Sequence, residues 1–375
     1  MAATLFARRW VFLAFLLAAL QLSGCAGVQR GWDAALLLAD LQAAGGDSML
    51  KRRTPAPHVT PLQYTIAGHA QVADRYAGPD ASRGTLVLIH GFTEAGRRDV
   101  RMVQFAESLA RSGFVVLAPE LPGMTDMSVG SAEREEIATA LRHATGHGRA
   151  GLVALSLAAG PAIHAAMKPD LADRVAYILL IGGYHDIVDV IRYATTGVDA
   201  ATGETADLRE PVQQGKWMLL RAQLRNLEDP QDHAALEAIA NARTQDPAAP
   251  VDRWLAQLTP DGRAVFALIE NTDPQRVDAL VAALPQRVRE ELAALDLARH
   301  DLGALRAQLL LVHGAADPVI PLSQSKRLAG ALPEGQVELF IPPDLSHVDL
   351  DPGLRDAWHL WRATTRLLAH AEASR

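Results

Sequence analysis

The stretch "GLVALSLAAG" at residues 151–160 places one serine, Ser156, between an apolar run and an alanine-rich run. A nucleophilic serine on a tight strand-to-helix turn crowds the residues two positions before and two positions after it, so both must be small. Ala154 and Ala158 hold these positions, in place of the two glycines of the G-x-S-x-G pattern. A serine at the start of a helix is also a common N-cap. Taken alone, the stretch therefore fits a nucleophile and a helix N-cap equally well.

Short apolar runs on both sides of this stretch alternate with helical patterns. Such runs predict strands buried on both faces of a parallel sheet, and the alternation predicts an α/β fold with helices on both faces. The runs are TLVLIHG (85–91), FVVLAPELPG (114–123), AGLVALS (150–156), VAYILLIGG (175–183), AQLLLVHG (307–314) and QVELFIPP (336–343). A hairpin is predicted over residues 62–78, before the first of these runs. We therefore expect a mostly parallel central sheet flanked by helices.

Only helical patterns occur between Tyr184 and Leu305. This predicts an α/β core in two parts, residues 62–184 and 305–375, interrupted by a helical cap over residues 185–304. Several large apolar side chains of the cap either line a pocket above the sheet or pack the cap helices against one another. They are Trp217, Met218, Leu219, Trp254 and Phe266.

A histidine and a glycine end the predicted strand of residues 85–91. Gly91 allows the backbone to turn closely around a ligand. The backbone N–H groups of Phe92 and Leu157 are then expected to form a two-donor oxyanion hole of the kind that acyl transfer needs. A simple strand-ending turn with His90 satisfied in the core is the alternative.

Two further chemical groups follow the last two predicted strands. Asp317 comes a few residues after one strand, where a carboxylate can orient a histidine, and His347 lies on a loop after the final strand. A general base needs such access, with its second ring nitrogen held by a carboxylate. Asp186 and Asp189 are rival acids at the end of an earlier strand, ranked lower because they open the helical insertion.

The order Ser156, Asp317, His347, with the HG-F turn upstream, resembles the α/β-hydrolase fold throughout residues 60–370. The resemblance implies an esterase- or lipase-like serine hydrolase, in which Ser156 is the nucleophile, His347 the base and Asp317 the acid. It implies an oxyanion hole at Phe92 and Leu157, a helical cap, and hydrolysis of carboxylic esters. The same triad also serves acyltransferases, thioesterases and peptidases, and a lipid-anchored binding protein without turnover is a further alternative.

The first 24 residues have the pattern of a leader peptide. Two arginines are followed by the apolar run "VFLAFLLAAL" and then by "LSGC", which resembles the cleavage site of bacterial lipoproteins. Cys25, the only cysteine, is then expected to be the lipidated N-terminus, and residues 25–61 to be a tether with a short helix over 32–47. Ala26 and Gly27 follow the cysteine without an aspartate. This resembles lipoproteins of the outer membrane that face the periplasm.

Charge and motifs restrict the remaining partners. Residues 1–24 carry two arginines and no acid, so their removal takes the formal charge from −7 to −9. This acidic balance argues against a nucleic-acid partner. The paired glycines of "IGGYHD" lack the G-x-G-x-x-G pattern of a dinucleotide site. We predict no metal and no cofactor, a small-molecule or lipid acyl substrate, and membrane contact through the N-terminal lipid; the sequence leaves the oligomeric state open.

Overall fold

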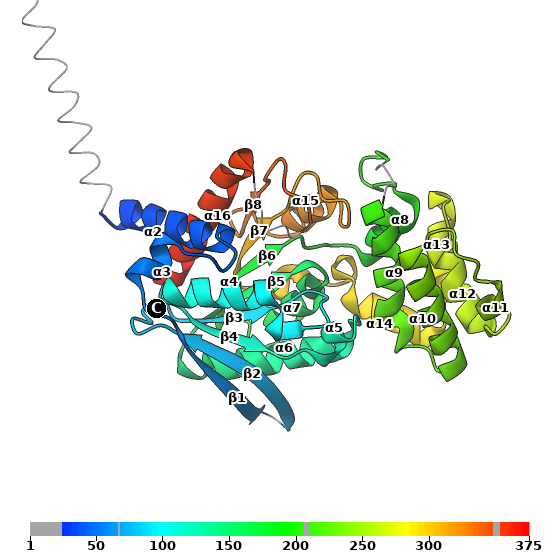
Figure 1. The fold of residues 1–375 in the computed structure, drawn as a ribbon, viewed down its shortest axis with the longest axis horizontal. Coiled ribbons are helices and arrows are strands. Elements are labelled where there is room, and N and C mark those ends of the chain that lie inside the picture. The colour runs from blue at the N-terminus through cyan, green and yellow to red at the C-terminus, as the bar shows by residue number, and fades with distance from the viewer. Residues whose placement is uncertain (1–24, 67, 206–209, 348–352, 375) are drawn as a thin grey trace, which may run out of the picture.

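The computed structural model describes residues 25–66, 68–205, 210–347 and 353–374, and its centre is one eight-stranded sheet. The strand order is β1-β2-β4-β3-β5-β6-β7-β8, parallel from β4 to β8, with the β1–β2 hairpin antiparallel to them at one edge (Figure 1). The strands are β1 His58–Ile66, β2 His69–Ala77, β3 Thr85–Ile89, β4 Val115–Pro119, β5 Ala150–Leu155, β6 Val175–Ile181, β7 Gln308–Val312 and β8 Val337–Phe340. The mostly parallel sheet expected from the apolar runs is confirmed.

Each central strand sends alternate side chains into two separate apolar layers. In β3, Leu86 and Leu88 pack toward one face of the sheet, and Val87 and Ile89 pack toward the other. The first face is covered by α2 Cys25–Gln42, α4 Val100–Arg111 and α16 Leu354–Ala373; the second is covered by α6 Ser131–Ala144, α7 Ala159–Ala166 and α15 Leu322–Gly330. A strand covered on both faces excludes water from both, which explains its uninterrupted run of apolar residues.

The N-terminal helix is longer than its sequence pattern indicates. It begins at Cys25, seven residues before the expected start, and ends at Gln42. Arg30 donates to Glu372 of α16 at 3.0 and 2.8 Å, and the indole of Trp361 donates to the Gly31 carbonyl at 2.8 Å. Helix α2 is therefore docked along α16 (Figure 1). The expected leader, residues 1–24, lies outside the described residues.

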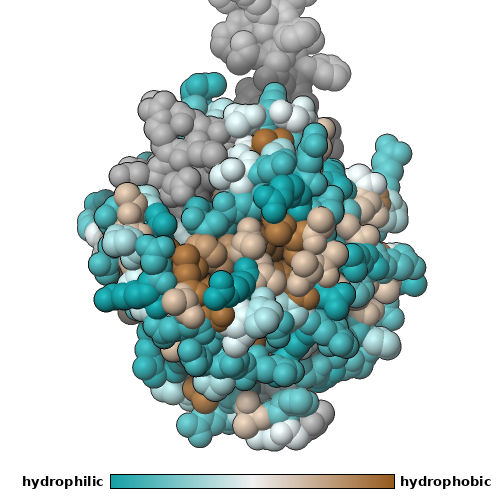
Figure 2. Space-filling view, turned by 90° about the vertical axis from the view of Figure 1, so that its right-hand side faces the viewer, coloured by the Kyte–Doolittle hydropathy of each residue, from teal (hydrophilic) through white to brown (hydrophobic). Residues whose placement is uncertain are grey.

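A group of helices lies between β6 and β7 and forms one end of the molecule (Figure 1). These helices are α8 Ile187–Thr196, α9 Glu210–Leu224, α10 Pro230–Gln245, α11 Asp252–Leu255, α12 Pro260–Ile269, α13 Val277–Ala282 and α14 Gln286–Leu295. Figure 2 shows this end of the molecule, where apolar side chains form a band across a mostly hydrophilic surface. No described helix is both long enough and apolar enough to cross a membrane.

A buried ionic contact joins these cap helices to the core. Glu133 of α6 is fully buried and accepts hydrogen bonds from both terminal nitrogens of Arg225, at 2.9 and 2.5 Å. Its carboxylate also accepts from the Gly130 N–H at 2.6 Å. Glu291 of α14 accepts from the Ser131 N–H and hydroxyl at 2.7 and 2.9 Å. Burying a carboxylate such as that of Glu133 is costly unless it is paired, so its contact with Arg225 links the cap to the core.

Glu136 lies three positions after Glu133 on α6 and makes the stability of the fold depend on pH. Its Oε2 atom is buried without a hydrogen-bond partner among the described residues. Burial and the neighbouring Glu133 carboxylate raise the pKa of Glu136 from its usual 4.5 to about 7. The folded chain therefore keeps a proton that the unfolded chain releases at lower pH. The contribution of Glu136 to the free energy of unfolding is therefore fully present below about pH 4.5 and is lost as pH rises toward 7.

We expect Glu136→Gln to raise the midpoint of thermal unfolding by a few degrees at pH 8 and to leave it nearly unchanged at pH 4.5. Glutamine stays neutral at every pH, so the cost of ionising this site disappears. Glu135→Gln is the matched control, because Glu135 is already paired with Lys168 and Arg142. Equal shifts at both pH values would show that ionisation of Glu136 is not the cause.

Candidate active site

Ser156 lies on a strained turn between β5 and the short 3-10 helix η3 Ser156–Ala158, which leads into α7. Its φ angle is +56°, a left-handed conformation that is costly for a residue with a Cβ atom. Ala154 and Ala158 are both fully buried beside it, so larger side chains there would meet a filled core. Gly91 approaches from β3: a Cβ atom built on it would lie 3.6 Å from the Ser156 Cβ. Such local strain concentrates at functional sites.

His347, on the loop after β8, reaches this serine. Its Nε2 lies 2.8 Å from the Ser156 Oγ, although the two residues are 191 positions apart in the chain. Gly182, which directly follows β6 and has a φ of +65°, leaves room for the imidazole, since a Cβ there would lie 3.1 Å from the His347 Cε1. The first glycine of "IGGYHD" therefore provides space for the histidine ring, a role that the sequence pattern did not indicate.

Asp317 holds the other side of the His347 ring. Its Oδ2 lies 2.7 Å from the His347 Nδ1, and its side chain is 1% exposed. The Oδ1 atom accepts from the backbone N–H groups of Val319 and Ile320, at 2.8 and 3.0 Å. These two donors fix the carboxylate plane, so that one oxygen stays directed at His347.

His313, at the end of β7, supports Asp317 and was not identified from the sequence. Its Nε2 lies 2.8 Å from the Ile320 carbonyl and 3.5 Å from the Asp317 Oδ2. Because a carbonyl only accepts, the Nε2 carries the proton and the Nδ1 accepts from the Ser325 hydroxyl at 2.7 Å. Burial lowers the pKa of His313, which keeps the ring neutral. Its only sequence signal is its place beside a glycine at a strand end.

The turn after β3 faces the serine from the opposite side. His90 is buried, its Nδ1 donates to the Gly91 carbonyl at 2.8 Å, and burial lowers its pKa. Among the described residues, none accepts a hydrogen bond from the Phe92 N–H. Leu157 lies in the first turn of η3, where N–H groups have no partner within the helix. Both residues line the same cavity as Ser156.

This cavity has a volume of about 210 Å³ and lies between the sheet and the cap. Most of its lining is apolar, but Asp99 and Arg101 also line it. The cap contributes Val190, Gly215, Met218 and Leu219. Of the five cap residues singled out in the sequence, Met218 and Leu219 therefore line the cavity, whereas Trp217, Trp254 and Phe266 pack into the apolar core instead.

Comparison with known proteins agrees with the fold of the chain. A model of the alpha/beta hydrolase fold family matches residues 84–353, which is most of the chain. The chain belongs to the α/β-hydrolase fold family. No curated protein sequence matches it significantly.

Several solved structures are similar to the chain at low sequence identity. The rice cell wall degrading esterase LipA of Xanthomonas oryzae is 13% identical, with a TM-score of 0.50, and the match covers 88% of this chain and 92% of that one. The acylaminoacyl peptidase of Pyrococcus horikoshii is 11% identical, with a TM-score of 0.48 and 86% of this chain covered. A puromycin-hydrolyzing peptidase of Mycobacterium tuberculosis is 16% identical, with a TM-score of 0.49 and 85% of this chain covered. The chain spans 42% of the length of the first peptidase and 39% of the length of the second.

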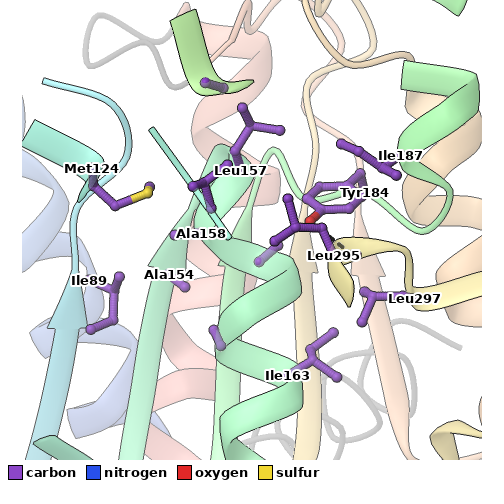
Figure 3. Packing of buried hydrophobic residues seen from close by; sticks show 14 of the residues in the cluster. Ile89, Met124, Ala154, Leu157, Ala158, Ile163, Tyr184, Ile187, Leu295 and Leu297 are labelled. Atoms are coloured by element: carbon purple, nitrogen blue, oxygen red, sulfur yellow. Dashed lines mark hydrogen bonds between the residues drawn. The ribbon is translucent and has the colours of Figure 1, made fainter. Parts of the chain in front are cut away.

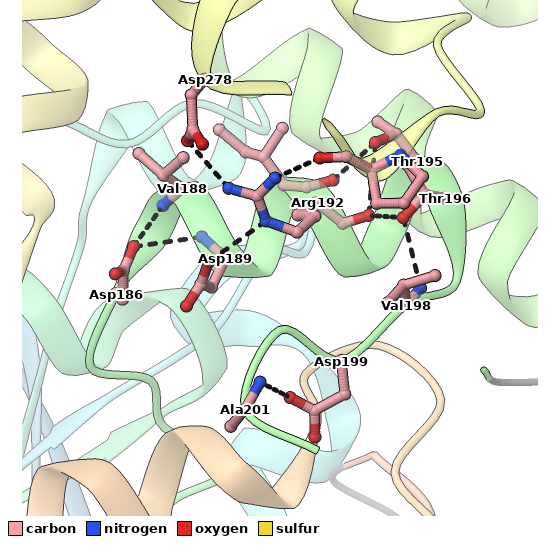
Figure 4. A network of polar contacts seen from close by, with 12 residues as sticks. Asp186, Val188, Asp189, Arg192, Thr195, Thr196, Val198, Asp199, Ala201 and Asp278 are labelled. Atoms are coloured by element: carbon pink, nitrogen blue, oxygen red, sulfur yellow. Dashed lines mark hydrogen bonds and ion pairs between the residues drawn. The ribbon is translucent and has the colours of Figure 1, made fainter. Parts of the chain in front are cut away.

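Asp186 and Asp189, the alternatives to Asp317 as the acid beside His347, have other partners (Figure 4). Asp186 caps α8 by accepting from the Val188 and Asp189 N–H groups at 3.0 and 3.1 Å. Asp189 pairs with Arg192, 3.3 Å away, and with Arg327. Neither carboxylate contacts His347. Among the described residues, no three histidine, cysteine, aspartate or glutamate side chains are grouped as a metal site requires.

Proposed function

We propose that this α/β-hydrolase fold protein is a serine hydrolase that cleaves carboxylic esters through an acyl-enzyme intermediate. One observation carries the proposal. The strained Ser156, His347 and Asp317 form a continuous hydrogen-bonded chain that opens into a mostly apolar cavity. A serine placed this way has a base within proton-transfer distance, and the base has a carboxylate that orients it.

In the first half-reaction, the Ser156 Oγ forms a bond to the acyl carbon while His347 Nε2 takes the hydroxyl proton. The Phe92 and Leu157 N–H groups stabilise the charge that develops on the carbonyl oxygen. Collapse of the tetrahedral intermediate breaks the bond to the alcohol, which leaves with the proton from His347. Asp317 keeps the His347 Nδ1 protonated throughout.

In the second half-reaction, water attacks the acyl-enzyme and gives one proton to His347. The bond between the acyl carbon and the Ser156 Oγ then breaks, the proton returns to that oxygen, and the carboxylic acid leaves. Water is the only co-reactant. The apolar cavity favours an ester with a hydrocarbon acyl group, because burial of each CH₂ contributes about 0.8 kcal/mol.

A fluorophosphonate probe and a series of p-nitrophenyl esters test the proposal on the purified protein. We expect the probe to label Ser156, identified by mass spectrometry of the tryptic peptide, and the esters to be hydrolysed. Labelling without ester hydrolysis would favour the same triad acting on thioesters, amides or an acyl acceptor other than water. If the probe does not label Ser156 and no ester is hydrolysed, the result would favour a binding protein of the same fold.

We also propose that Cys25 carries lipid and holds the hydrolase at the cell envelope, on the periplasmic face of the outer membrane. The "LSGC" pattern supports lipidation, and the docking of α2 on α16 would keep the catalytic core close to the bilayer. In a diderm bacterial host, labelled palmitate should be incorporated into the wild-type chain and into Ser156→Ala. Incorporation should be lost in Cys25→Ser, and persistent labelling of that variant would contradict the proposal.

A further inference from the structure

A second, smaller cavity lies inside the cap, directly behind the wall of the active-site cavity. It has a volume of about 30 Å³. Two side chains, Leu157 and Leu219, line both cavities and therefore form the partition between them. Figure 3 shows Leu157 near the head of α7, with Ile187 and Leu295, which line the inner cavity, to its right.

The inner cavity is lined almost entirely by hydrocarbon. Apart from Gln223, its other lining residues are all aliphatic, among them Ile187, Ile191, Leu220 and Leu295. Cavities of this kind remain dry and accept apolar groups. Its lining therefore matches the chemistry of a hydrocarbon chain.

The lining of the active-site cavity includes one charged pair as well as apolar side chains. Arg101 makes two hydrogen bonds to Asp99, at 3.0 and 2.8 Å, and its side chain is 61% exposed. Leu157 and Leu219, in contrast, separate this cavity from the inner one. A polar or water-exposed leaving group suits the Asp99–Arg101 pair, and an acyl chain suits the apolar wall that Leu157 and Leu219 form.

We propose that Leu219 is the specificity-determining residue that limits acyl chain length, because its side chain separates the active-site cavity from the inner cavity, which becomes the subsite for the distal carbons of a longer chain when this side chain is smaller. This proposal rests on the esterase function proposed above. Leu157 cannot vary freely, because its backbone forms part of the catalytic turn. Leu219 belongs to helix α9 of the cap, a separate element from the turns that carry Ser156 and His347.

The test compares p-nitrophenyl butanoate with p-nitrophenyl decanoate. In Leu219→Ala we expect the ratio of kcat/KM for decanoate over butanoate to rise tenfold or more, since opening the partition admits additional methylenes. Leu224→Ala is the matched control: it removes the same atoms from the same helix, in a residue that is buried but lines neither cavity. Its ratio should match that of the wild type.

Two results would overturn the assignment of Leu219. One is an equal rise of the ratio in Leu219→Ala and Leu224→Ala, which would indicate general loosening of the cap. The other is an unchanged acyl series combined with a shift in a series of alkyl alcohols on a constant acyl group, which would place the leaving group at Leu219.

A binding measurement separates this inference from the proposed function. In the Ser156→Ala background, calorimetry with decanoic acid should show tighter binding when Leu219 is also alanine, with butanoic acid unaffected. Absence of that gain would refute the subsite even if esters are hydrolysed. Conversely, the gain would support the subsite even if the fluorophosphonate and ester experiments exclude hydrolysis.

Discussion

Ser156→Ala is expected to lower kcat for ester hydrolysis by about 10⁵- to 10⁶-fold, the scale of loss seen when a triad serine is removed. The variant retains the cavity and the N–H groups of Phe92 and Leu157, but it has no oxygen to attack the acyl carbon. Alanine keeps the Cβ atom of serine, so the strain at φ +56° is unchanged and folding should be unaffected. Initial rates on p-nitrophenyl butanoate, with circular dichroism of both proteins, provide the measurement.

A second serine variant shows whether such a loss is specific. The Ser112 hydroxyl bonds the Ser108 carbonyl at the end of α4, and Ser112 does not line the active-site cavity. Ser112→Ala should therefore keep wild-type activity. If Ser156→Ala retained more than about a hundredth of the wild-type kcat, after exclusion of a contaminating esterase, another nucleophile would have to be sought.

Asp317→Asn is expected to lower kcat by about 10⁴-fold with little change in stability. The reason lies in the two backbone donors at Val319 and Ile320, which require an oxygen on their side of residue 317. The asparagine oxygen must stay there, so its NH₂ group faces the His347 Nδ1. That nitrogen must then accept, which moves the proton to Nε2, and a protonated Nε2 cannot take the proton of Ser156.

The rival acids provide the comparison for this prediction. Asp189→Asn changes a carboxylate that pairs with Arg192 and Arg327, so kcat should stay within a few-fold of wild type. A nitrogen NMR spectrum of the His347 ring should show the change of protonated nitrogen in Asp317→Asn. A small effect of Asp317→Asn, or a large effect of Asp189→Asn, would contradict the geometry of the site.

Much of the core was predictable from the sequence because a strand that is buried on both faces consists of consecutive apolar residues. A strand covered on both faces, such as β3 or β5, must be apolar at every position, and this pattern requires no knowledge of its neighbours. The order of groups along the chain indicated which strand ends carry Ser156, Asp317 and His347. Since parallel strands end at one edge of the sheet, that order also predicts that the three meet.

Where local pattern is weak, the sequence prediction was incomplete. Residues 25–31 of α2 show little apolar periodicity, and their helix is supported by Glu372 and Trp361, more than 300 positions away. The local sequence around Gly182 and His313 likewise does not indicate their roles. Their roles exist only because the folded chain brings them against His347 and Asp317.

The sequence by itself determined the class of fold, the positions of the buried strands and the order of the chemical groups. Only the tertiary structure decided which groups Asp186 and Asp189 bind, and that Met218 and Leu219, but not Trp217, line the cavity. The physical reason is that apolar periodicity shows that a side chain is buried, whereas the partner it meets depends on how helices rotate and pack against the sheet.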